Sequence, residues 1–145
     1  MLEYSANYSV GRGTEAPFEM IGADFIHGTE LAAYLNQRWI PGARFYAVRF
    51  QPSSAHLAGA EIEGVRIEVT NRESLDSARL GLEIASALLK LYPGQISLDA
   101  NRNLIGNQDT VRALMNGDDP RLIRQQQQDA LQTFLALREK YLLYR

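Results

Sequence analysis

Strict alternation of apolar and charged residues in the middle of the chain constrains the fold more than any other feature. Val65, Ile67 and Val69 point to one side, whereas Arg66 and Glu68 point to the other. This period of two is typical of a strand that has one buried and one solvated face. The fold must therefore contain a sheet, and other elements must cover one side of it.

The other strand signals are weaker. Aromatic and apolar residues alternate from 44 to 50 and predict a strand that Pro52 closes, because proline supplies no hydrogen-bond donor to a ladder. Residues 4–10 contain strand formers and predict an edge strand, while 17–27 is expected to be mostly irregular. A short segment, 96–98, is a further candidate strand.

Helical periodicity marks two segments in the first two thirds of the chain. One begins at Gly28 or Thr29 and is ended by Pro41 and Gly42. Its apolar residues recur every four positions, at Leu31, Leu35 and Trp39. Ser74 is the expected N-cap of the second helix. The apolar stripe of that helix alternates spacings of three and four, at Leu75, Ala78, Leu82, Ala85, Leu89 and Tyr92.

Two more helices are expected in the last third of the chain. The polar run 99–107 is interpreted as a loop, and a brief helix follows it and ends at Gly117. Asp119 with Pro120 predicts an N-cap and first helical position, and the helix that starts there is expected to run to about Leu142. The apolar face of this helix carries Ile123, Leu131, Phe134, Leu135 and Tyr141.

This order of elements predicts an α/β or α+β domain with one layer of sheet. We expect a single small mixed sheet of about three to four strands covered by helices, and a long C-terminal helix. The 145 residues, 46% of them hydrophobic and 22% charged, fit one compact domain over 1–145. The absence of cysteine excludes disulfide frameworks, zinc ribbons and thiol nucleophiles.

Charge and hydropathy exclude several classes of partner. A formal net charge of -2 gives no basic field for a phosphate backbone, so we expect no nucleic-acid partner. No apolar run reaches the roughly 20 residues that span a bilayer, and no signal-peptide pattern follows Met1, so we expect no membrane insertion. His27 and His56 have no second ligand at metal-binding spacing, and no phosphate loop or dinucleotide fingerprint occurs, so we expect no metal and no other cofactor.

Two pairs of acidic residues are candidates for glycoside hydrolysis, which uses one protonated and one ionised carboxyl group. Glu61 and Glu63 alternate on a strand face that is expected to be wet, so a solvated pair is favoured. Glu15 and Glu19 lie beside a glycine turn and are better placed. His56 lies in the loop between two strands, where it is either a binding group or merely exposed.

The turn Gly11-Arg12-Gly13-Thr14 places a guanidinium between two residues that have no side chain. A planar anion can therefore approach both the guanidinium fork and the backbone amides, so a carboxylate ligand would suit this turn. The alternative interpretation is that Arg12 pairs with a nearby acid such as Glu19 and fixes the loop.

A longer signature surrounds this turn. It runs through Asn7-Tyr8-Ser9-Val10-Gly11-Arg12-Gly13-Thr14, Pro17-Phe18-Glu19 and Ile21-Gly22-Ala23. It continues with Leu35-Asn36, Pro41-Gly42-Ala43-Arg44-Phe45, Phe50-Gln51-Pro52, Gly64-Val65, Val69-Thr70-Asn71-Arg72, Leu91-Tyr92-Pro93 and 138–144. In order and spacing these segments resemble the exo-acting β-N-acetylmuramidases, a bacterial family, over essentially the whole chain.

The resemblance implies that this chain is the C-terminal half of a two-domain enzyme and is inactive alone. In that family a Rossmann-like N-terminal domain carries the catalytic acids, and its Glu-His-Gly run and its motif rich in Asp and Gln have no counterpart here. The implied partners are that N-terminal catalytic domain and the muramyl sugar of peptidoglycan fragments, from which terminal N-acetylmuramic acid is released. The family context implies a periplasmic or secreted location.

The implied site centres on the carboxylate of the muramyl lactyl ether, because a bidentate arginine matches that group. We expect Arg12 to recognise it, with Glu19 orienting the guanidinium and this domain closing one wall of the cleft. The expected substrate-binding residues are Gly11, Arg12, Gly13, Thr14, Glu19 and His56. Two alternatives stay open: a non-catalytic domain that docks onto the catalytic half or forms a homodimer, and a stand-alone binder of an acidic ligand.

Overall fold

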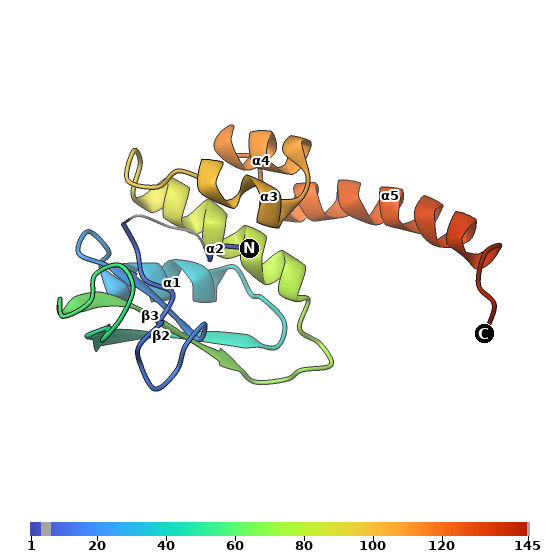
Figure 1. Cartoon of the computed structure of the whole chain (residues 1–145). Helices are drawn as coiled ribbons and strands as arrows, with labels where there is room; N and C mark the ends of the chain where they lie inside the picture. Colours follow the sequence, from blue (N-terminus) through green and yellow to red (C-terminus); the bar gives the residue numbers. More distant parts are fainter. Residues whose placement is uncertain (4–6, 145) are drawn as a thin grey trace.

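The computed structural model describes residues 1–3 and 7–144. It confirms the predicted mixed α/β class, with one small sheet, helices that cover it and a long C-terminal helix (Figure 1). In chain order the elements are β1 (Met20–Ala23), α1 (Gly28–Gln37), β2 (Ala43–Phe50), β3 (Ile62–Val69), α2 (Ser77–Leu91), the 3-10 helix η1 (Asp99–Asn101), α3 (Arg102–Ile105), α4 (Gln108–Met115) and α5 (Pro120–Glu139).

The sheet has β3 in its centre, with β1 and β2 paired to its two edges. Ile21 of β1 and Ala47 of β2 both lie opposite Val65, which is fully buried. The strands predicted at 65–69 and 44–50 are therefore confirmed. A mixed sheet was expected, but both pairings are antiparallel. The loop between β2 and β3 contains no helix, whereas a parallel pair of strands needs a long crossover connection.

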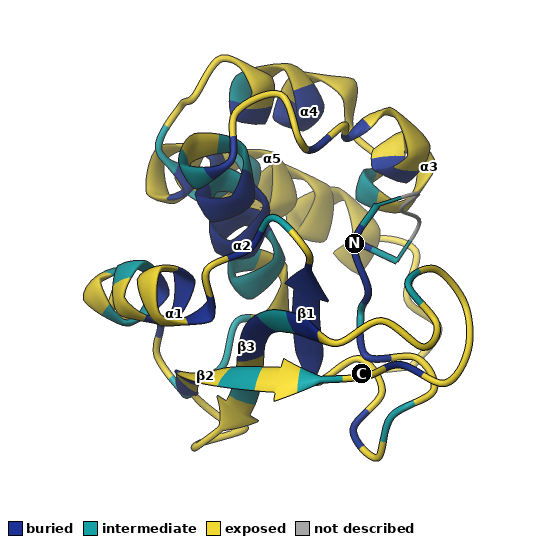
Figure 2. Cartoon of the chain, turned by 90° about the vertical axis from the view of Figure 1, so that its left-hand side faces the viewer, coloured by how far each residue is buried: buried dark blue, intermediate teal, exposed yellow. Residues whose placement is uncertain are grey.

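The helices lie on one side of the sheet and pack on one another in succession. α1 packs on the sheet, α2 packs on α1, and α4 and α5 pack on α2 (Figures 1 and 2). Asn36 of α1 attaches to β2, because its Nδ2 donates to the Phe45 carbonyl at 2.8 Å and its Oδ1 accepts from the Phe45 amide at 3.2 Å. Fully buried leucines of the helices are Leu31, Leu35, Leu82, Leu88 and Leu114.

The sequence analysis missed strand β1 and expected 17–27 to be mostly irregular. All four residues of β1 are buried, so the strand has no polar alternation by which it could be recognised. The expected edge strand at 4–10 lies partly outside the described residues; its described part makes one bridge, in which Ser9 and Gly22 exchange hydrogen bonds of 2.8 and 3.0 Å. Segment 96–98 is not a strand and leads into η1.

Two helix ends also differ from the prediction. α1 ends at Gln37, and Trp39 has a φ of 51° and a side chain that is 71% exposed, so it does not continue the helical stripe. α2 is capped by Asp76, whose carboxylate accepts from the amides of the first turn, whereas the Ser74 amide bonds to Asn71 before the helix begins. The run expected as a loop contains η1 and α3.

The predicted start of α5 is confirmed, because the Asp119 side chain accepts from the Arg121 amide and Pro120 occupies the first helical turn. Of the apolar face predicted for this helix, Ile123 is buried, whereas Phe134 and Tyr141 are exposed. The second half of α5 projects away from the body (Figure 1). Among the described residues, no helix combines the length and apolar character needed to cross a membrane.

Candidate functional site

The glycine-arginine turn is a tight, internally bonded loop. Gly11 and Gly13 both have positive φ values, 78° and 76°. The Thr14 amide and hydroxyl donate to the Gly11 carbonyl at 3.1 and 2.7 Å. A Cβ at position 13 would lie 2.5 Å from the Ser54 backbone nitrogen, so this position requires glycine for space as well as for conformation.

Arg12 lies at the surface, with 46% of its side chain exposed. Its guanidinium forms an ion pair with Glu3 and lies 4.9 Å from the centroid of the Phe18 ring. The expected contact with Glu19 is not formed, because the Glu19 carboxylate lies 3.8 Å from Arg66 instead. Arg12 is therefore held by two neighbours and still accessible to a ligand.

The loop that carries His56 docks on the turn. The Ser53 amide and hydroxyl both donate to the Gly13 carbonyl, at 3.0 and 2.8 Å. His56 itself is exposed. The structure thus brings the loop that contains His56 against the turn at 11–14, and both His56 and the turn had been predicted as parts of the site.

Two hollows border this region. A larger one, of about 450 Å³, lies on the sheet and is lined by charged and aromatic residues, including Glu19, Tyr46, Arg66, Glu68 and Arg72. A smaller one, of about 200 Å³, is mainly apolar and is lined in part by Glu3 and Phe18, the two neighbours of Arg12. The smaller hollow therefore shares two of its lining residues with the surroundings of Arg12.

Arg66 is the site residue that sequence reasoning missed. It lies 3.8 Å from both Glu15 and Glu19, so the pair considered as catalytic acids gathers around one guanidinium. The signal was present, because Arg66 stands on the solvated face of the clearest strand, but its partners are distant in sequence. Both carboxylates are therefore ion-pair partners of one residue of β3.

One member of the second carboxylate pair is bound by an arginine. Glu63 accepts hydrogen bonds from Arg49 at 2.9 and 2.6 Å and from the Gly28 amide at 3.3 Å. These bonds, chiefly those from Arg49, lower the pKa of Glu63 below its usual value. Glu61 is exposed. Among the described residues, no group of three or more His, Asp or Glu side chains is arranged to hold a metal ion.

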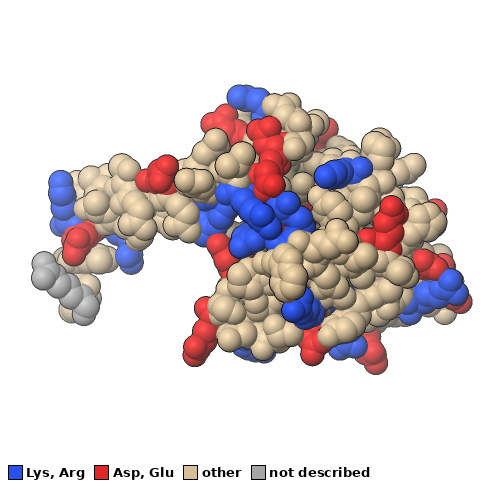
Figure 3. All heavy atoms as spheres, turned by 180° about the vertical axis from the view of Figure 1, so that it is seen from behind, with Lys and Arg blue, Asp and Glu red and all other residues tan. Residues whose placement is uncertain are grey.

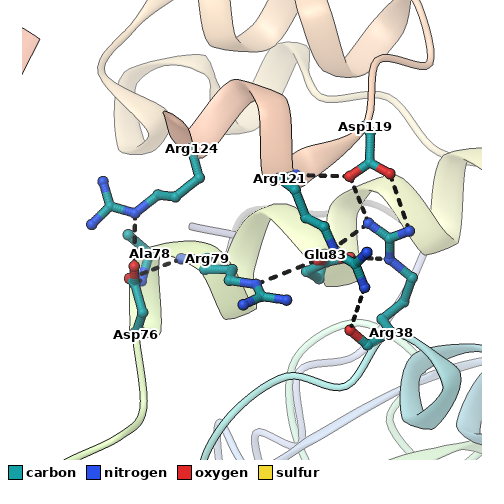
Figure 4. A network of polar contacts seen from close by, with 8 residues as sticks. All are labelled: Arg38, Asp76, Ala78, Arg79, Glu83, Asp119, Arg121 and Arg124. Atoms are coloured by element: carbon teal, nitrogen blue, oxygen red, sulfur yellow. Dashed lines mark hydrogen bonds and ion pairs between the residues drawn. The ribbon is translucent and has the colours of Figure 1, made fainter. Parts of the chain in front are cut away.

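A third polar cluster ties α5 to α1 and α2 (Figure 4). The buried Glu83 of α2 accepts from Arg38 Nε at 2.6 Å and Nη2 at 3.3 Å, and Arg38 also donates to Asp119 at 2.7 and 3.2 Å. The bonds from Arg38 lower the pKa of Asp119 below its ordinary value. Arg124 of α5 donates to Asp76 at 2.7 Å, which gives the helix a second tie to α2.

Comparison with known proteins gives three matches. A family model described as "Exo-beta-N-acetylmuramidase NamZ, C-terminal" matches residues 1–144. The protein "Peptidoglycan beta-N-acetylmuramidase NamZ" of Bacillus subtilis (strain 168) is 36% identical over 141 residues, which is 95% of this chain and 34% of that protein. The crystal structure of a DUF1343 family protein from Bacteroides fragilis aligns with a TM-score of 0.65 and 20% identity, over 97% of this chain and 38% of that one.

These matches differ in what they establish. At 20% identity, the Bacteroides structure supports the fold alone. The chain spans about a third of the length of each of the two relatives, 34% and 38%. The shared region therefore corresponds to one part of longer proteins.

Proposed function

Because this chain belongs to the family of C-terminal domains of the exo-β-N-acetylmuramidase NamZ, we propose that it serves a longer enzyme that releases terminal N-acetylmuramic acid from peptidoglycan fragments. The observation that carries this proposal is the family match over residues 1–144, which includes the glycine-arginine turn. In this proposal the chain forms one wall of the substrate cleft.

The state of the carboxylates supports a catalytic pair supplied from outside this chain. Glycoside hydrolysis needs one carboxyl group that is kept protonated. Arg49 lowers the pKa of Glu63 and so favours its ionised form, and Glu15 and Glu19 form ion pairs with Arg66. The proposed partner is accordingly the N-terminal catalytic domain of the longer polypeptide.

The proposed role of the turn is to bind the carboxylate of the muramyl lactyl group. Arg12 offers a planar donor fork, and 46% of its side chain is exposed to a ligand. Glu3 holds the guanidinium in place, so a ligand carboxylate would share or replace this ion pair. The docked loop with His56 would form the neighbouring edge of the cleft, and Glu19 would act through the adjacent hollow rather than through Arg12.

The test is Arg12→Lys in the longer polypeptide, assayed on a chromogenic N-acetylmuramic acid glycoside and on the matching N-acetylglucosamine glycoside. Loss of the bidentate fork should lower kcat/KM on the muramyl substrate by about tenfold or more, because hydrogen bonds to charged groups contribute about 1.5–3 kcal/mol. The second substrate lacks the lactyl carboxylate and should be much less affected. Arg112→Lys, in an exposed ion pair of α4, is the matched control.

Equal losses on both substrates, or unchanged kinetics on the muramyl substrate, would show that Arg12 does not recognise the lactyl group. The family membership would stand in either case. The role of this domain would then have to be structural.

A further inference from the structure

The end of the chain forms an uncovered apolar surface. Residues 131–144, here called the α5 arm, include Phe134, Leu137 and Tyr141, whose exposed fractions are 57%, 53% and 76%. Leu131 and Leu135 are 38% and 39% exposed. Figure 1 shows this arm projecting beyond the rest of the fold. A contiguous apolar surface of this kind usually marks a binding interface.

The arm continues a helix face that packs against the body further back. Ile123 is 3% exposed, and Arg124 reaches Asp76 on α2 at 2.7 Å. Leu131 follows Arg124 after two helical turns and therefore lies on the same side of α5. Gln127, between them, donates to Thr110 at 3.0 Å. This side of the helix is thus held to the body by polar side chains near its base, and it is apolar and uncovered in the arm.

A basic notch lies at the inner end of the arm. We define it by Arg79, Arg121 and Arg124, which gather beside α2 and the base of α5 (Figure 4). Figure 3 shows basic side chains in the angle where the projecting helix meets the body. In this cluster four arginines, these three with Arg38, face three carboxylates.

The three carboxylates of the cluster do not pair with all the charges and hydrogen-bond donors of its arginines. Arg38 takes most of the hydrogen bonds offered by Glu83 and Asp119. Arg79 Nε is buried, lies 3.5 Å from Glu83 and has no hydrogen-bond partner among the described residues. With four arginines to three carboxylates, the cluster has positive charge to offer a further acidic group.

We propose that the α5 arm and the basic notch together bind another domain of the same longer polypeptide, through a surface that presents carboxylates beside apolar side chains. This inference rests on the proposed function, which gives the chain a catalytic partner domain. The relatives supply the room for one, because the chain covers 34% and 38% of their lengths. The family match extends to residue 144, so the arm belongs to the shared region.

A second copy of the chain fits this surface less well. Pairing two arms would cover their leucines, but the notch would still need carboxylates. Between residues 128 and 144 the acidic residues are Asp129 and Glu139, and Glu139 is flanked by Arg138 and Lys140. The arm therefore brings little negative charge to a notch on its twin, whereas a different domain can supply it.

Amide hydrogen exchange tests the proposal. It is compared at residues 131–139 in this chain alone and in the longer polypeptide. A buried helix opens less often than a projecting one, so these amides should exchange at least about tenfold more slowly in the longer polypeptide. Sedimentation velocity is run on both samples. Equal exchange in both, or a dimer of this chain whose arm amides are already protected, would overturn the proposal.

Three variants of the longer polypeptide localise the contact. Leu131→Glu with Leu135→Glu puts charge into the apolar face and should abolish the added protection. Ala136→Glu introduces a charge of the same sign on an exposed position at least about 100° around the helix from Leu131, Phe134 and Leu135, and should leave the protection intact. Arg121→Glu reverses one charge of the notch and should reduce it. Protection that survives both the double leucine substitution and the Arg121 substitution would refute the assigned surface.

The outcomes separate this inference from the proposed function. Docking of the arm is measured as exchange and needs no substrate, while the muramyl role of Arg12 is measured as kinetics. Protection with no muramidase activity would support the interface and remove the enzymatic role. Activity with an unprotected arm would do the opposite.

Discussion

The body of the molecule and the α5 arm use the same kinds of residue with opposite results. In the body, Leu82 and Leu88 are completely buried between helices. In the arm, Leu131 and Phe134 stand on an equally regular stripe and remain 38% and 57% exposed. The comparison teaches that helical periodicity identifies a face that needs cover, but it does not identify what covers it.

The largest expected effect on stability comes from the polar cluster around Glu83, which joins the helices of the body. Glu83→Ala removes the buried carboxylate that accepts hydrogen bonds from Arg38 and forms an ion pair with Arg79. Both arginines then lose this negative partner. We expect a loss of about 3–5 kcal/mol in the free energy of unfolding, since removing one partner of a buried pair leaves an uncompensated charge. Urea unfolding followed by far-UV circular dichroism measures it.

The control for this variant is Glu139→Ala, an acidic residue at the exposed end of α5. Its effect should be within about 0.5 kcal/mol. If Glu83→Ala cost no more than Glu139→Ala, the cluster would contribute nothing to holding the helices together.

The next effect compares the two halves of α5. Ile123→Ala empties a site that is 3% exposed and should cost about 2–4 kcal/mol in unfolding free energy. Leu131→Ala, two turns later and 38% exposed, should cost less than about 1 kcal/mol in the chain studied alone. Similar losses at the two positions would mean that the arm is packed against the body in solution.

A smaller effect is expected on the free energy of unfolding at low pH. Arg38 lowers the pKa of Asp119 below the ordinary 3.8, so the stabilising contribution is present above that value and is lost as pH falls through the lower folded-state pKa. The carboxylate is 41% exposed and screened by water, so we expect about 1 kcal/mol or less. Asp119→Asn keeps a good N-cap and should lose less stability than the wild type between pH 7 and pH 2.5 in urea titrations.

The smallest effect is expected on the arm itself. Phe134→Ser should change the melting temperature of the isolated chain by no more than about 2 °C, because the ring contributes little burial there. Its solubility should rise, since an exposed aromatic is removed from an apolar patch. Thermal scans and concentration-dependent light scattering check the two halves of this expectation. A large drop in melting temperature would show that the ring is covered.

The sequence predicted the elements whose periodicity is regular. The strands around Val65 and Tyr46 alternate, and the long helix starts at the combination of Asp119 and Pro120. Strand β1 could not be found in this way, because all four of its residues are buried. Ser74 was predicted as the cap, whereas Asp76 is the cap in the structure; both residue types suit the position, and the tertiary bond from Arg124 to Asp76 is invisible in the sequence.

The sequence predicted the segments that form the candidate site better than it predicted the contacts between them. The turn at Arg12 and the loop of His56 were both nominated, and the structure shows the two segments bonded through Ser53 and Gly13. The pairing of Glu19 with Arg66 was not foreseen, because it depends on the register between β1 and β3. The basic notch was also missed, since its members come from segments far apart in the chain.

Trp39 has an optical consequence. It is the chain's lone tryptophan, and its indole is 71% exposed with Arg44 at 5.6 Å from the ring. Its emission in the native state already reflects contact with water, so intrinsic fluorescence is a poor reporter of denaturation for this molecule.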